Sequence, residues 1–115
     1  MSDSLPASIE FACNPSAMNA EQRQRHEVVA RQLFAAVREV RSLADGYGFQ
    51  LNIGQLELAA EFVTRERLCC PFFNFTLNVE AASESFLLHI GGPEGVKAFI
   101  QAEFGEVLAP NLLQQ

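Results

Sequence analysis

The sequence predicts one α+β domain in which helices cover one face of a mainly antiparallel sheet. Two segments repeat apolar residues every three or four positions, as helices do, and others alternate apolar and polar residues, as half-buried strands do. A chain of 115 residues, 49% hydrophobic and 19% charged, is long enough to bury one substantial core. The expected order of elements is β-α-β-β-α-β-β-α.

The first predicted elements are a strand at 8–13 and a helix that follows a short turn. Asn19, with Gln22 three residues later, matches a capping box at the start of this helix. The helix is expected to run to about Val37. Its apolar face is formed by residues at spacings of three and four, namely His26, Val29, Ala30, Leu33, Phe34 and Val37.

Two hairpins are predicted, one on each side of a second helix. The first hairpin turns at Asp45-Gly46, a common turn dipeptide, and the second pairs 73–80 with 85–90. The helix between them spans 54–70, because Pro71 disfavours helical geometry in the residue before it.

A third helix is predicted after Gly91-Gly92, with Pro93 near its first position and Val96, Phe99 and Ile100 on its inner face. The domain is expected to span 1–115, with flexible or arm-like ends at 1–7 and 109–115.

The net charge of −6 disfavours several classes of partner. Acidic residues spread through the chain repel nucleic acid and acidic membranes, and no basic stripe offsets them. The N-terminus lacks the features of a secretion signal, and no apolar run approaches the length of a membrane span. Three cysteines cannot make a complete disulfide framework, so we expect a cytoplasmic protein with thiols that are free or bound to a metal.

The helix over 54–70 places a carboxylate where the core is expected. At about 100° per residue from Leu56, Glu66 falls at about 280°, in the middle of the apolar arc and between Cys69 and Cys70. An unpaired buried carboxylate costs several kcal/mol, so Glu66 must be neutral, paired, hydrogen-bonded or bound to a metal. In the simplest alternative it reaches solvent or pairs with Arg23 or Arg31.

Cys69 and Cys70 are poor candidates for free nucleophiles. They lie at a helix C-terminus, where the helix dipole is negative, and Glu66 is beside them. Adjacent cysteines also lack the Cys-x-x-Cys spacing of thioredoxin-like sites.

A thiophilic cation would supply the positive charge that this site lacks. Cys69 and Cys70 are the first candidate ligands, with Cys13 as a third thiolate, Glu66 as a ligand or nearby base, and His26 as a nitrogen donor. His89 is the weaker histidine, because it alternates with Phe86, Leu88 and Ile90 and should face away from them. Such a set suits Zn(II), or three-thiolate binding of Hg(II) or As(III).

Two other hypotheses remain open. The protein could be an enzyme in which Glu66 acts as a general base with Cys69 or Cys70 on a small substrate in a phenylalanine-lined pocket. It could also be a structural or interaction module whose cysteines are core residues. Phe72 is expected opposite Phe73 and Phe75 on its strand, where its exposure would favour a homodimer or a ligand pocket.

Two motifs resemble those of a group of small bacterial proteins largely without assigned function. The first is Glu-x-x-Cys-Cys-Pro-Phe-x-x-Phe at 66–75, and the second is Gly-Pro-x-Gly-Val-Lys-x-Phe at 92–99. An early cysteine before an arginine-bearing helix, here Cys13 and Arg23, is also similar. Some members accompany heavy-metal response genes, so the resemblance favours metal binding, and it implies no catalytic residue.

Overall fold

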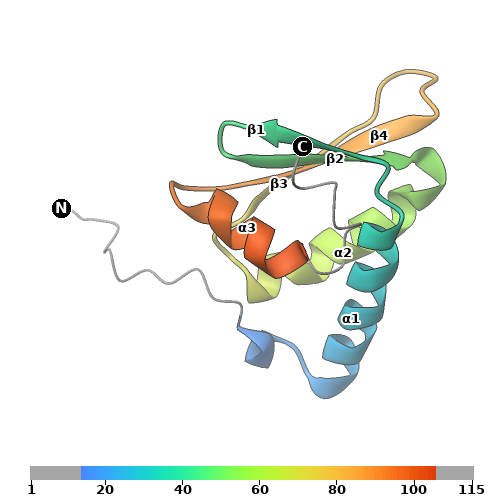
Figure 1. Ribbon diagram of the computed structural model, residues 1–115. Coiled ribbons are helices and arrows are strands. Elements are labelled where there is room, and N and C mark those ends of the chain that lie inside the picture. The colour runs from blue at the N-terminus through green and yellow to red at the C-terminus, as the bar shows by residue number, and fades with distance from the viewer. Residues whose placement is uncertain (1–13, 106–115) are drawn as a thin grey trace.

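A four-stranded antiparallel sheet carries three helices on one of its faces (Figure 1). The computed structural model describes residues 14–105, and the predicted α+β class is confirmed there. The elements follow the order α1-β1-β2-α2-β3-β4-α3, with short 3-10 turns before α1 and α2. The predicted strand at 8–13 and the predicted arms at 1–7 and 109–115 lie outside the described residues.

Helix α1 (Ala20–Ala35) begins at the predicted capping box. The side chain of Asn19 accepts the Gln22 N–H at 2.8 Å, and the Asn19 N–H donates to the Gln22 side chain at 2.9 Å. The predicted inner face is buried, with Ala30 only half-buried, but the helix ends at Ala35, so Val37 is buried just beyond the helix rather than on it. It presents one polar side chain to the core, that of His26.

The sheet has the strand order β1-β2-β4-β3, so β2 and β4 are central. The strands are β1 (Glu39–Leu43), β2 (Gly46–Asn52), β3 (Asn74–Asn78) and β4 (Ser85–Gly91). On the helix-covered face, pairs of buried residues lie opposite one another in the two central strands, namely Tyr47 and Ile90, Phe49 and Leu88, and Leu51 and Phe86. Each unit of one helix and one hairpin, α1-β1-β2 or α2-β3-β4, thus supplies one central and one edge strand.

Helix α2 (Leu56–Cys69) and helix α3 (Val96–Phe104) complete the layer. The predicted start of α3 near Pro93 is wrong, because Gly95 precedes the helix with a left-handed φ of 96° and Pro93 lies in the turn before it. The predicted place of Phe72 on the strand, opposite Phe73 and Phe75, is also wrong, and its side chain is half-buried. Phe72 precedes β3 rather than belonging to it, and its ring packs edge-on against Phe73 and Phe99 with centroids 4.9 and 5.2 Å away.

Aromatic rings fill the space between the helices. Phe34 of α1, Phe62 of α2 and Phe104 of α3 contact one another with ring centroids 4.6 to 6.0 Å apart. Such pairs contribute about 0.5–1.5 kcal/mol each beyond the area that they bury. This cluster fixes α1 and α2 against each other and therefore sets the position of any site between them.

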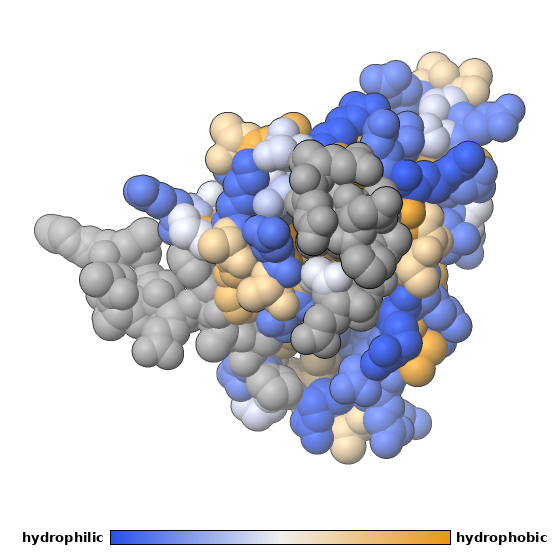
Figure 2. All heavy atoms as spheres, viewed as in Figure 1, coloured by the Kyte–Doolittle hydropathy of each residue, from blue (hydrophilic) through white to orange (hydrophobic). Residues whose placement is uncertain are grey.

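The visible surface of the described residues mixes hydrophilic side chains with separate hydrophobic patches (Figure 2). The exposed large hydrophobic residues are Val28, Leu68 and Val79, which lie on α1, on α2 and after β3. The homodimer therefore stays a prediction. None of the helices in the described part combines the length and apolar character that crossing a bilayer requires.

Gly46 should be far less tolerant of a side chain than Gly48 in the same strand. A methyl group on Gly46 would overlap the Ile90 carbonyl oxygen, which belongs to the backbone, whereas on Gly48 it would lie 3.1 Å from the flexible end of Leu87. We expect Gly46→Ala to lower the free energy of unfolding by about 1–3 kcal/mol, and Gly48→Ala by less. Urea unfolding measures both, and equal losses would contradict the predicted contact.

Candidate functional site

Three buried polar side chains meet between α1 and the end of α2. His26 Nε2 lies 2.6 Å from Glu66 Oε1, and the Cys69 Sγ lies 3.7 Å from the same oxygen. The possible ligand atoms of His26, Glu66 and Cys69 all lie within 4.8 Å of one another. The structure thus brings together three of the five residues predicted as metal ligands.

The helices position this cluster through their spacing and contacts. Glu66 and Cys69 are three residues apart in α2 and so share one face of the helix. Beside the cluster, the guanidinium of Arg25 in α1 donates to both carboxylate oxygens of Glu61 in α2, at 2.6 and 2.8 Å. Arg65 donates to Glu61 at 2.8 Å, and the hydrogen bonds from Arg25 and Arg65 lower the pKa of Glu61 to about 2. This surface ion pair links α1 to α2.

Glu66 is 4% exposed, so the alternative in which it reaches solvent is wrong. Its partner is His26 rather than Arg23 or Arg31, and the Arg23 guanidinium donates to the Met18 carbonyl at 2.7 Å. The His26 ring stacks on Phe62 with centroids 5.3 Å apart. Its second nitrogen, Nδ1, is buried and has no hydrogen-bond partner within residues 14–105.

The two adjacent cysteines, Cys69 and Cys70, differ in oxidation state. Cys69 is free, as predicted, whereas Cys70 is disulfide-bonded, so the expectation that all thiols are free or metal-bound does not hold for Cys70. Their sulfurs lie 3.6 Å apart, too far for a bond between them. The predicted ligand Cys13 lies outside the described residues. Its neighbour Asn14 donates a backbone hydrogen bond to the Cys69 carbonyl at 2.7 Å.

The cluster disfavours further negative charge. Burial, followed by the charge and hydrogen bond of Glu66, raises the pKa of Cys69 from an ordinary 9.0 to about 12, and Glu103 adds to this shift. Burial and the charge of Glu66 also raise the pKa of Glu103 on α3. The predicted weakness of this thiol as a nucleophile is therefore supported, although burial rather than the helix end is the main cause.

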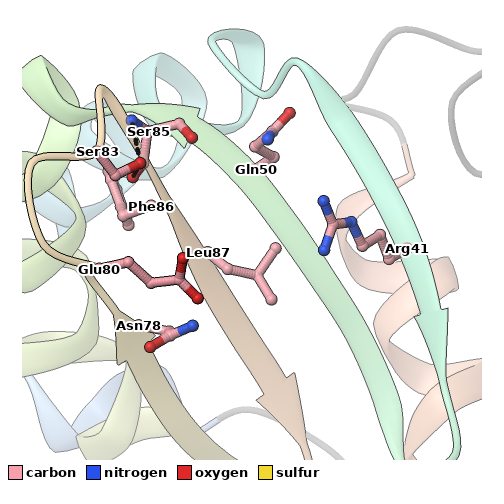
Figure 3. A pocket seen from close by; sticks show the side chains of 8 residues that line it. All are labelled: Arg41, Gln50, Asn78, Glu80, Ser83, Ser85, Phe86 and Leu87. Carbon is pink, nitrogen blue, oxygen red and sulfur yellow. Dashed lines mark hydrogen bonds between the residues drawn. The ribbon is translucent and has the colours of Figure 1, made fainter.

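Two other features of the structure lie away from this cluster. His89 faces away from the buried residues of β4, as predicted, and its Nε2 lies 2.9 Å from an oxygen of Asp45. A shallow pocket lies on the sheet face opposite the helices (Figure 3), lined by Arg41, Gln50, Asn78, Glu80, Ser83, Ser85, Phe86 and Leu87. Of the predicted ligands that the structure describes, none lines this polar pocket.

The direct pairing of His26 with Glu66 was not predicted. A signal was present in the sequence, because each is a polar residue on the apolar face of its helix, and two such residues can satisfy each other in the core. Glu103 was missed because it lies on the exposed side of α3, where an acidic residue is ordinary.

No protein-family model matches the chain, and neither a curated protein nor a solved structure is detectably similar to it. The resemblance carried by the motifs at 66–75 and 92–99 stays a prediction. Function is therefore inferred from the geometry and chemistry of the buried cluster.

The raised pKa of Cys69 predicts a loss of stability at alkaline pH. The unfolded chain releases this proton near pH 9.0 and the folded chain only near about 12, so stability that is complete below pH 9.0 falls across that interval. The loss contributed by Cys69 is at most about 1.4 kcal/mol for each pH unit. Urea unfolding at several pH values should show a steeper decline for the wild type than for Cys69→Ala. Parallel declines would contradict the predicted shift.

Proposed function

We propose that this protein binds a thiophilic metal ion between α1 and α2, with Cys69, Glu66 and His26 as ligands. The observation that supports the proposal most directly is the convergence of these three buried donors from two helices. Cys70, and Cys13 as predicted from the sequence, would supply further thiolates in the reduced protein. The partner is then a metal ion in a cytoplasmic protein, rather than a nucleic acid or a membrane.

The distances within the cluster suit a tetrahedral ion after a small adjustment. Bonds of about 2.3 Å to sulfur and about 2.1 Å to oxygen and nitrogen separate two sulfurs by about 3.8 Å, sulfur and oxygen by about 3.6 Å, and nitrogen and oxygen by about 3.4 Å. The sulfurs of Cys69 and Cys70 are 3.6 Å apart, and the Cys69 sulfur is 3.7 Å from Glu66. The 2.6 Å contact between His26 and Glu66 must widen to admit the ion.

Electrostatics favours a cation over thiol catalysis at this site. Burial and Glu66 raise the pKa of Cys69, so its nucleophilic thiolate is scarce without a bound positive charge. A metal ion supplies that charge and stabilises the thiolate and the carboxylate together. A set of nitrogen, oxygen and sulfur ligands suits Zn(II), whereas Hg(II) and As(III) would be coordinated by the thiolates alone.

The cluster also differs from a purely structural buried pair. Buried polar atoms in native proteins are hydrogen-bonded in the great majority of cases. Among the described residues, the Nδ1 atom of His26 has no hydrogen-bond partner, and the buried carboxylate of Glu66 receives one imidazole nitrogen and one weak thiol donor. A buried carboxylate with so few donors is costly in a core, and a cation bound to Glu66 would offset that cost.

Titration of the reduced protein with Co(II), followed by displacement with Zn(II), tests this proposal. We expect one equivalent of Co(II) to bind with a sulfur-to-cobalt charge-transfer absorption. Cys69→Ser and Glu66→Gln should each weaken binding by about 100-fold or more, because each removes a ligand. Competition with Hg(II) and As(III) then ranks the thiophilic ions.

Matched controls are available for two of the three ligands. Glu57→Gln removes an exposed carboxylate from the same helix, and His89→Gln removes the other histidine, so both should leave the Co(II) affinity unchanged. His26→Gln should weaken it. Thermal unfolding of each variant establishes that it is folded. Failure of the reduced wild type to bind any of these ions, or equal binding by Cys69→Ser, would overturn the proposal.

A further inference from the structure

We propose that the disulfide at Cys70 is a redox switch that sets how many thiolates this metal centre can offer. The inference rests on the proposed metal binding and concerns its regulation. Cys70 is disulfide-bonded and fully buried, and its sulfur lies 3.6 Å from that of the free Cys69. A change in the state of Cys70 therefore occurs directly at the cluster.

The switch follows from what a metal requires of sulfur. A thiolate binds a metal because it is negatively charged, whereas a disulfide sulfur has no charge and no proton that a metal could displace. In the oxidised protein, Cys69 is the single thiol beside His26 and Glu66. In the reduced protein, Cys70 adds a second sulfur at nearly the spacing of two ligands on one ion.

Cys13 is the partner that the sequence offers for this disulfide. The chain has three cysteines, of which Cys69 is free. The backbone hydrogen bond from Asn14 to the Cys69 carbonyl brings the residue next to Cys13 in sequence to the end of α2. Reduction would then release Cys13 as well, which provides the three thiols that As(III) or Hg(II) requires.

Reduction is a two-electron step that a dithiol can supply. The sulfur–sulfur bond at Cys70 breaks, each of its sulfurs receives a proton and becomes a thiol, and the dithiol closes its own disulfide. A metal ion that then binds displaces one proton from each thiol that coordinates it.

An internal exchange with Cys69 is disfavoured. Attack by Cys69 on the Cys70 sulfur would join two neighbouring residues at the end of a helix, which strains the geometry of a disulfide. The switch therefore requires an external reductant and does not transfer its bond to Cys69.

Metal titration of the oxidised and reduced wild type tests the switch. The two forms are prepared without reductant and with a dithiol that is removed under anaerobic conditions, and their masses differ by the two hydrogens of the disulfide. We expect the reduced form to bind Zn(II), with Co(II) as the optical probe, about 100-fold or more tightly than the oxidised form. Binding of As(III) should be confined to the reduced form.

Two variants separate the switch from the metal site. Cys13→Ser prevents the disulfide but keeps Cys69 and Cys70, so its Zn(II) affinity should be high with or without dithiol treatment. Cys70→Ser should bind weakly and equally under both conditions. If a variant does not fold, the comparison of the two wild-type forms still decides the question.

The outcomes distinguish the two proposals. Equal affinity in the oxidised and reduced wild type, or a Cys13→Ser variant that still responds to dithiol, would overturn the switch and leave metal binding intact. Failure of both forms to bind Zn(II), Co(II), Hg(II) and As(III) would overturn the proposed function and the switch together.

Discussion

The contact between His26 and Glu66 is the constraint on which the arrangement of this site depends. A carboxylate that is 4% exposed has lost its hydration, and the imidazole nitrogen of His26, 2.6 Å away, compensates for much of that loss, with the Cys69 thiol as a weaker donor. The same charge contributes to the raised pKa of both Cys69 and Glu103. Removal of Glu66 would therefore change the ionisation of its neighbours as well as the packing of the core.

The surrounding fold holds this contact from two sides. Toward the core, Phe62 stacks on the imidazole ring and contacts Phe34 and Phe104, so the ring cannot move without disturbing all three helices. Toward solvent, the ion pair between Arg25 and Glu61 links the same two helices. The aromatic side chains on one side and the exposed ion pair on the other restrict the movement of His26 and Glu66. This restriction favours a preformed ligand geometry.

Local patterns predicted much of this structure, and contacts between elements account for what was missed. Asn19 and Gln22 marked the start of α1, and helical spacing placed Glu66 on the buried face of α2, because both depend on residues close in sequence. The partner of Glu66 lies 40 residues away and depends on how the helices pack. The start of α3 was predicted too early, because proline often occupies the first position of a helix. Here the left-handed Gly95 delays the start of the helix to Val96.

The strand order β1-β2-β4-β3 has a consequence for how the site is assembled. His26 belongs to the first helix-and-hairpin unit and Glu66 to the second, and the units join where β2 pairs with β4. Neither half of the chain holds a complete donor set, so the cluster comes into being only when the halves dock. Completion of the tertiary structure and creation of the ligand environment are thus one event, and an ion that prefers the assembled cluster would bind the docked pair and not the separate halves.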